Sequence, residues 1–161
     1  MSRIGSQGND HVRRRGWILV GVNVARPARQ ALVEARHLAC EREGTLMVLH
    51  VIDTHYLEEA ARLADVPERH LRERLGVERR NRLAELLKET DDGAGDVPTE
   101  SMIAWGHPFE EILKKANDLP ADLIVLGTAG RSADLERALF GSTADKVLRS
   151  TPCAVLCVPM D

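Results

Sequence analysis

The stretch that decides the fold covers residues 122–159 and begins with Asp122-Leu123-Ile124-Val125-Leu126-Gly127. Residues 123–126 form a short unbroken apolar run, which is typical of a strand buried on both faces of a sheet. The run ends at Gly127, where we expect the chain to turn tightly and its backbone to approach a ligand. Residues 153–158 form a second apolar run and predict another buried strand.

A helix is predicted between these two strands, starting at Gly141-Ser142-Thr143-Ala144-Asp145. We expect the Ser142 hydroxyl to cap it, with Asp145 at the return position of a capping box. Unpaired N–H groups and the helix dipole attract anions, so a strand, a glycine loop and a capped helix can cradle a phosphate. The same glycines are also ordinary loop punctuation, and the chain has neither a Walker lysine nor the glycine spacing of a dinucleotide site.

Length and composition indicate one globular domain with an aliphatic core. The chain has 161 residues, of which 43% are hydrophobic and 3% aromatic, and no apolar run approaches the length of a membrane span. The few aromatic residues and the net charge of -3 argue against a protein that coats nucleic acid. We therefore expect a cytoplasmic protein with neither a nucleic-acid nor a membrane partner.

Several polar residues allow a structural interpretation in place of a functional one. Cys40, Cys153 and Cys157 do not form a disulfide framework, and we interpret them as small buried apolar residues in a reducing compartment. His50 interrupts an apolar run and is expected to be a core or strand-end histidine. Asp53 and His55 supply two potential ligands, which are too few for a metal site.

The order of elements along the chain predicts an α/β domain, residues 16–161, that follows a flexible N-terminal tail, residues 1–15. Strands alternate with helices, which implies a parallel sheet with right-handed crossovers and helices on both faces. The expected strands cover residues 17–22, 46–52, 97–105, 123–126 and 153–158, and the expected helices lie between them, with Pro67 dividing the helical segment 54–90 and Pro108 opening the next helix.

In such sheets, ligands bind beyond the carboxyl ends of the strands, where the winding reverses. If the first and fourth strands are neighbours, the loop at Asn23 faces the loop at Gly127. A nucleotide would then lie between these loops, with its phosphates at residues 141–143.

Parts of the sequence resemble the universal stress protein family. The resemblance covers residues 17–159 and is most specific in four segments, which are Gly106-His107-Pro108-Phe109-Glu110-Glu111-Ile112-Leu113, residues 121–127 with Gly130-Arg131, residues 141–149, and residues 152–159. It implies a single-domain fold of the adenine nucleotide alpha hydrolase-like type, with a five-stranded parallel sheet of order 3-2-1-4-5. It also implies a homodimer formed through the last strand.

The family's ATP-binding members carry the pattern G-x2-G-x9-G-[ST]. In this chain Gly127 and Gly130 match the first part and Gly141-Ser142 the last, with ten residues between them in place of nine. The resemblance implies ATP, with or without Mg²⁺, as the ligand. Its phosphates would be held by backbone N–H groups around Gly127, Gly130, Gly141 and Ser142 and by the hydroxyls of Ser142 and Thr143.

At the adenosine end, Val22, Asn23 and Val51 would enclose the base and the ribose. ATP-binding relatives usually have an aspartate in a V-D-x-S context, where this chain has Val22-Asn23-Val24-Ala25. Asparagine keeps a carbonyl acceptor, gains a donor and loses the charge. Arg131 is placed to meet a phosphate, although an exposed loop arginine is an alternative interpretation.

The sequence therefore predicts a stress-response regulatory protein that binds ATP or a related adenine nucleotide. The alternative is a dimeric interaction module that binds no nucleotide and acts through protein partners, which Asn23 and the longer glycine spacing favour. An enzyme would be at most a slow ATPase or an autophosphorylating protein, because the sequence has no nucleophile elbow, acid pair or metal-ligand cluster.

Overall fold

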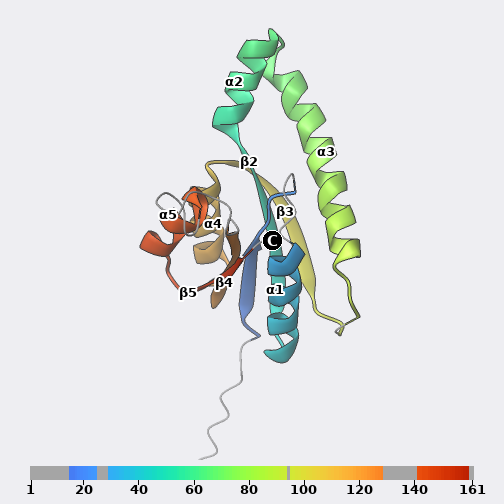
Figure 1. Ribbon diagram of the computed structural model, residues 1–161, viewed down its shortest axis with the longest axis vertical. Coiled ribbons are helices and arrows are strands. Elements are labelled where there is room, and N and C mark those ends of the chain that lie inside the picture. Colours follow the sequence, from blue (N-terminus) through green and yellow to red (C-terminus); the bar gives the residue numbers. More distant parts are fainter. Residues whose placement is uncertain (1–14, 25–28, 94, 129–140, 160–161) are drawn as a thin grey trace, which may run out of the picture.

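The computed structural model describes residues 15–24, 29–93, 95–128 and 141–159 (Figure 1). The elements follow one another along the chain as β1 (Trp17–Gly21), α1 (Arg29–Glu41), β2 (Thr45–Asp53), α2 (Thr54–Ala64), α3 (Glu68–Glu89), β3 (Thr99–Gly106), α4 (Pro108–Asp118), β4 (Leu123–Thr128), α5 (Ser142–Ser150) and β5 (Ala154–Pro159). The strands form one sheet in the order β3-β2-β1-β4-β5, and all neighbouring strands are parallel. The predicted α/β fold and strand order are thus confirmed.

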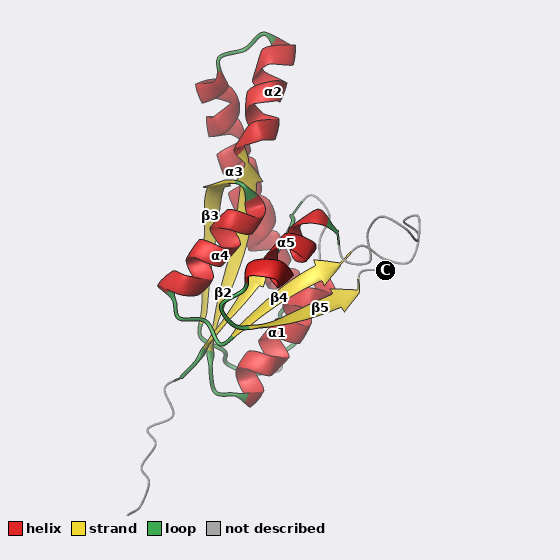
Figure 2. Ribbon diagram, turned by 90° about the vertical axis from the view of Figure 1, so that its left-hand side faces the viewer, coloured by secondary structure: helices red, strands yellow, loops and turns green. Residues whose placement is uncertain are grey.

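Helices cover both faces of the sheet (Figure 2). Successive residues of a strand point to opposite faces, so Val20 packs in the core beneath α1 and α3, whereas Leu19 packs in the core beneath α4 and α5. Both side chains are completely buried. Because both faces are covered, the central strands must be apolar throughout, which explains the unbroken apolar runs in the sequence.

Helices α2 and α3 form a hairpin that projects beyond the carboxyl ends of the strands (Figures 1 and 2). Pro67 separates the two helices, as predicted, and Asp65 ends α2 in the left-handed conformation with a φ of 52°. Leu57 and Ala61 are buried on α2, and Gly76, Leu83 and Leu86 are buried on α3. The hairpin is therefore a packed part of the fold, and it lies at the edge of the sheet where the strands end.

Strand β4 continues past the point where the sequence predicts a turn. Gly127 pairs with Val158 and Thr128 pairs with Pro159, so Gly127 lies inside the strand and not in a loop. The prediction was wrong because β5 continues alongside β4 and extends the pairing. Cys40, Cys153 and Cys157 are free, but all three are half-buried, whereas the sequence interpretation made them buried; Cys157 lies on β5, which is an edge strand.

Two further sequence-based expectations concern a membrane span and the N-terminal tail. None of the helices in the described part of the chain combines the length and the apolar character that crossing a bilayer requires. The predicted N-terminal tail lies, up to residue 14, outside the described residues.

Candidate functional site

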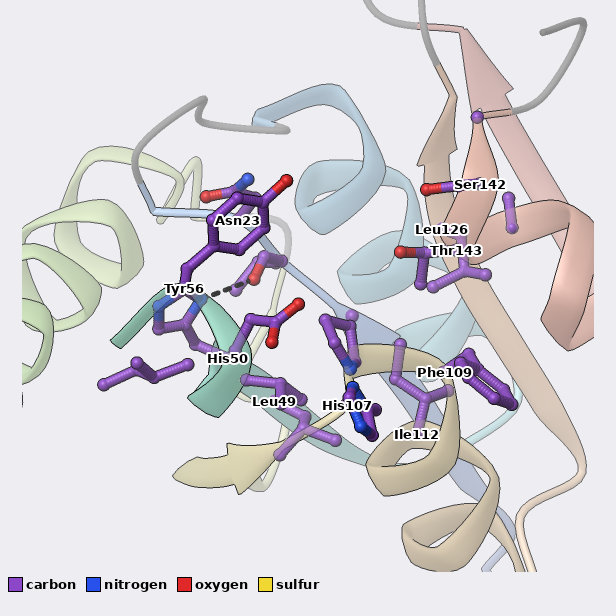
Figure 3. Close-up of a pocket in the computed structure, with 18 of the residues that line it drawn as sticks. Asn23, Leu49, His50, Tyr56, His107, Phe109, Ile112, Leu126, Ser142 and Thr143 are labelled. Atoms are coloured by element: carbon purple, nitrogen blue, oxygen red, sulfur yellow. Dashed lines mark hydrogen bonds between the residues drawn. The ribbon is translucent and has the colours of Figure 1, made fainter. Parts of the chain in front are cut away.

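A pocket of about 760 Å³ opens at the carboxyl edge of the sheet (Figure 3). Its wall comes from the ends of β1, β2 and β4, the hairpin α2–α3, and the starts of α4 and α5. The order β3-β2-β1-β4-β5 makes the gap between β1 and β4 the place where the winding reverses. Ligands of doubly wound sheets bind at this place, so the topology marks the pocket as the candidate site.

The structure brings together seven of the nine residues predicted from the sequence, which are Val22, Asn23, Val51, Gly127, Gly141, Ser142 and Thr143. Asn23 lies on one side of the pocket, and Ser142 and Thr143 lie across from it on α5 (Figure 3). The two remaining residues, Gly130 and Arg131, lie outside the described residues.

The start of α5 differs from the predicted capping box. Gly141 is the N-cap residue and no side chain caps the helix, because Ser142 is already the first helical residue. Asp145 does not turn back to the cap; its carboxylate forms an ion pair with Arg149 at 3.0 Å. The backbone N–H of Asp145 makes the first bond of the helix, to the Gly141 carbonyl at 3.0 Å, so the amides of residues 142–144 have no carbonyl within the helix.

Gly141 is required at this position by its backbone conformation. Its φ of 83° and ψ of 158° fall in a region that is essentially restricted to glycine. An added Cβ would meet nothing within 4 Å, so space is not the constraint. The glycine predicted at the helix start is therefore needed to direct the chain into α5.

Lys146 is a pocket residue that the sequence analysis missed. It follows Ser142 by one helical turn, so both side chains lie on the same face of α5. Its ammonium group lies 4.8 Å from the centre of the Phe109 ring on α4, which also lines the pocket. The i,i+4 spacing from Ser142 could have revealed this lysine, and it places a positive charge beside the uncapped helix start.

His50 joins the end of β2 to the end of β1. Its Nδ1 lies 2.9 Å from the Val22 carbonyl oxygen, and since a carbonyl can only accept, Nδ1 carries the proton. The side chain is 5% exposed, as expected for a buried strand-end histidine, but Nε2 has no hydrogen-bond partner among the described residues. Burial lowers the pKa of His50, the bond to Val22 opposes that shift, and the charge of Arg79 adds to it.

The hairpin contributes a side of the pocket that no sequence motif indicated. Tyr56, Leu57 and Ala60 come from α2, and Leu75 and Arg79 come from α3. Asp53 fixes the start of α2, because its carboxylate accepts from the His55 backbone N–H at 2.9 Å. Asp53 is therefore a helix cap. Its position as the last residue of β2, at the carboxyl edge, is the feature of the sequence that could have placed the following helical turn beside the site.

Comparison with known proteins agrees with this architecture. Residues 16–159 match the universal stress protein family. Universal stress protein YxiE of Bacillus subtilis is 31% identical over 148 residues, which cover 88% of this chain and 97% of that protein. The solved structure of the protein MJ0577 has a TM-score of 0.70 at 26% identity, covering 91% of this chain and 97% of that one.

Two further solved structures contain adenine nucleotides. A universal stress protein in complex with cAMP has a TM-score of 0.61 at 19% identity, covering 91% of this chain and 98% of that one. The universal stress protein from Archaeoglobus fulgidus in complex with dAMP has a TM-score of 0.60 at 20% identity, covering 88% and 96%. At these identities the likeness establishes a shared fold. Given the match over residues 16–159 and the 31% identical relative, this chain belongs to the universal stress protein family.

Proposed function

We propose that this stress-response protein binds ATP or a related adenine nucleotide as a regulatory ligand in the pocket at the carboxyl edge of the sheet. The observation that supports the proposal most strongly is the start of α5, which opens on the pocket without a side-chain cap. Three backbone amides without helical partners attract an anion of the size and charge of a phosphate.

The phosphates would lie against the first turn of α5. The backbone N–H groups of residues 142–144 and the hydroxyls of Ser142 and Thr143 supply donors, and Lys146 supplies a compensating charge. Gly127 also lines the pocket and has no side chain to fill the space. Gly130 and Arg131 remain predicted phosphate contacts from the sequence.

The base and the ribose would lie toward Val22, Asn23 and Val51. His50 supports this end of the pocket, because its hydrogen bond to the Val22 carbonyl fixes the chain one residue before Asn23. The family neighbours that hold cAMP and dAMP agree with an adenine ligand. At 19% and 20% identity those neighbours share the fold with this chain, and the groups that would recognise the ligand are those of its own pocket.

Mg²⁺ would enter the pocket bound to the phosphates of ATP, and not at a metal site formed beforehand by protein side chains. No three His, Cys, Asp or Glu side chains lie close enough to hold a metal together anywhere in the described residues. Mg²⁺ is commonly bound through substrate phosphates and retained waters, so this pocket fits a magnesium nucleotide without an acidic cluster.

Calorimetric titration with MgATP tests the proposal. We expect measurable heat and a rise in melting temperature at millimolar MgATP, because a ligand that binds the folded state alone stabilises it. A titration without heat, accompanied by an unchanged melting temperature, would overturn the nucleotide proposal.

The second candidate function is an interaction module that binds no nucleotide, and Asn23 favours it because the charge of the family's usual aspartate is missing. Nucleotide released on denaturation of the purified protein, read by its absorbance, separates the two. Bound ATP in the purified protein removes the interaction module as an explanation of the pocket.

We further propose a cytoplasmic homodimer assembled through β5. In the described sheet β5 pairs with β4 on one side, and its other edge is open to a second copy. Three free cysteines suit the reducing conditions of the cytoplasm.

A further inference from the structure

We propose that Tyr56, in the first turn of α2, is the platform on which the base of the nucleotide stacks, and that it makes the pocket selective for purines. This inference rests on the proposed nucleotide function and adds a residue that neither the glycine pattern nor the strand ends supply. It assigns the hairpin a direct role in ligand recognition.

The position of Tyr56 sets it apart from an ordinary exposed aromatic residue. A single exposed apolar side chain is normal on a protein surface. Tyr56 is 71% exposed, yet it lines the pocket together with Asn23 and Val51, which belong to the proposed base and ribose end. Figure 3 shows its ring on the side of the pocket that lies across from Ser142 and Thr143. A base bound near Asn23 would therefore meet this ring while its phosphates reach α5.

The backbone that carries the Tyr56 ring is fixed before any ligand arrives. The Asp53 carboxylate accepts from the His55 backbone N–H at 2.9 Å and so fixes the turn of helix from which Tyr56 projects. The side chain has only two rotatable torsions, so ordering it against a base costs little conformational entropy. Tyr56 is therefore suited to act as a rigid contact surface.

Tyr56 and Phe109 both line the described part of the pocket, but the faces of their rings have different neighbours. Lys146 lies over the Phe109 ring, 4.8 Å from its centre, so this face serves a cation at the phosphate end. The nearest ring to Tyr56 in the described part of the chain is His55, 6.3 Å away and tilted by 56°, which is no stacked partner. Tyr56 can therefore offer a ring face to a base.

Stacking on an aromatic side chain contributes most for the largest ring system. A purine covers more of the tyrosine ring than a pyrimidine does, so ATP should bind more tightly than CTP. Loss of such a platform typically costs about 1–3 kcal/mol per base, which corresponds to a roughly 5- to 150-fold larger dissociation constant. The same factor should apply to ATP, AMP and adenosine, because all three share the base.

The chain contains a single tyrosine, so a selectively labelled tyrosine gives one set of ring resonances. We expect MgATP to shift these resonances upfield through the ring current of adenine and to produce cross-relaxation between the tyrosine ring protons and adenine H2 or H8. Tyrosine resonances that stay unshifted in protein saturated with MgATP would overturn the inference.

Three variants complete the test. Tyr56→Leu should weaken the binding of ATP and of adenosine by the factor given above. Tyr56→Phe should retain the affinity for both ligands, because the ring is kept. Leu63→Ala is the matched control: Leu63 lies on the same helix, is 77% exposed and does not line the pocket, so its loss should leave affinity unchanged. The exposure of Tyr56 means that its replacement should leave the melting temperature of the free protein unchanged.

The outcomes separate the two proposals. If the wild-type protein gives no heat with MgATP, the nucleotide function itself fails. If the wild-type protein binds MgATP and Tyr56→Leu binds it equally well, the nucleotide function stands and the role of Tyr56 is wrong.

Discussion

Lys146 illustrates how a single side chain can be assigned a role from its place on a helix. Its ammonium group is held over Phe109, one turn beyond Ser142, at the end of the pocket where the α5 amides lie. Lys146→Gln keeps a hydrogen-bond donor on a slightly shorter side chain and removes the charge. We expect ATP to bind roughly tenfold more weakly, because a hydrogen bond to a charged group contributes about 1.5–3 kcal/mol.

Two measurements show whether Lys146 acts on the phosphates: the affinity for adenosine compared with that for ATP, and the dependence of ATP affinity on salt concentration. Adenosine, which has no phosphate, should bind Lys146→Gln as well as it binds the wild type, and the salt dependence of ATP affinity should decrease. Lys114→Gln on the exposed side of α4 is the control, because Lys114 does not line the pocket. An equal loss of adenosine affinity in Lys146→Gln would mean that the lysine acts on the shape of the pocket and not on the phosphates.

His50 predicts how stability depends on pH. Burial lowers the pKa of His50 in the folded protein below its ordinary value of 6.5, so the unfolded chain takes up a proton more readily. The unfolded state therefore binds more protons as the pH falls below about 6.5, and stability decreases over that range until the pH reaches the folded pKa.

The variant His50→Asn checks the pH prediction. The asparagine amide can still donate to the Val22 carbonyl, but it does not titrate. Urea unfolding at pH 7.5 and pH 5.5 should show a smaller loss of stability at the lower pH in His50→Asn than in the wild type. An identical loss in both proteins would show that other groups control the acid sensitivity.

At the scale of elements, the start of α5 is the feature on which the nucleotide proposal depends. Gly141→Val places a β-branched residue at a φ of 83° and a ψ of 158°, which should cost about 1–3 kcal/mol of stability and turn the first amides of the helix away from the pocket. ATP affinity should fall by more than tenfold, in a calorimetric titration carried out well below the melting temperature.

Gly93→Val is the matched control for the helix start. Gly93 also has a positive φ, 72°, with nothing within 4 Å of an added Cβ, but it lies outside the pocket. The Gly93→Val variant should be less stable than the wild type and should keep the ATP affinity of the wild type. Any slow ATPase activity should fall with Gly141→Val, and hydrolysis that survives this change would point to a contaminating enzyme.

At the scale of the whole molecule, the open edge of the sheet predicts the oligomeric state. We expect a dimer by light scattering at micromolar concentration, with β5 as the contact. Cys157→Lys adds a charge to this edge and should yield monomers, since edge lysines prevent strand pairing. Met102→Lys on β3, the opposite edge strand, where Met102 is 38% exposed, should leave the dimer intact. A monomeric wild type, or monomers from both variants, would contradict a dimer built on β5.

The sequence by itself determined the class of fold and the edge of the sheet at which a ligand would bind. The unbroken apolar runs are typical of strands covered on both faces, and their alternation with helices implies a parallel sheet whose ligand site lies at the carboxyl edge. The residues predicted for the base and phosphate ends meet at that edge because strand ends and helix starts converge there. Local pattern was sufficient for the fold class and for the candidate phosphate cradle, whereas the strand order that places the base end across from that cradle came from the resemblance to the family.

The tertiary structure decided how the elements end and which distant residues reach the pocket. Gly127 lies in a strand because β5 continues beside it, and Gly141 caps α5 because its φ is positive there, whereas local propensity favoured a turn and a serine cap. Tyr56 reaches the pocket only because the hairpin projects from the edge where the strands end. The place of Gly127 within a strand and the reach of Tyr56 into the pocket depend on pairing or packing between segments far apart in the chain, which short-range sequence patterns do not encode.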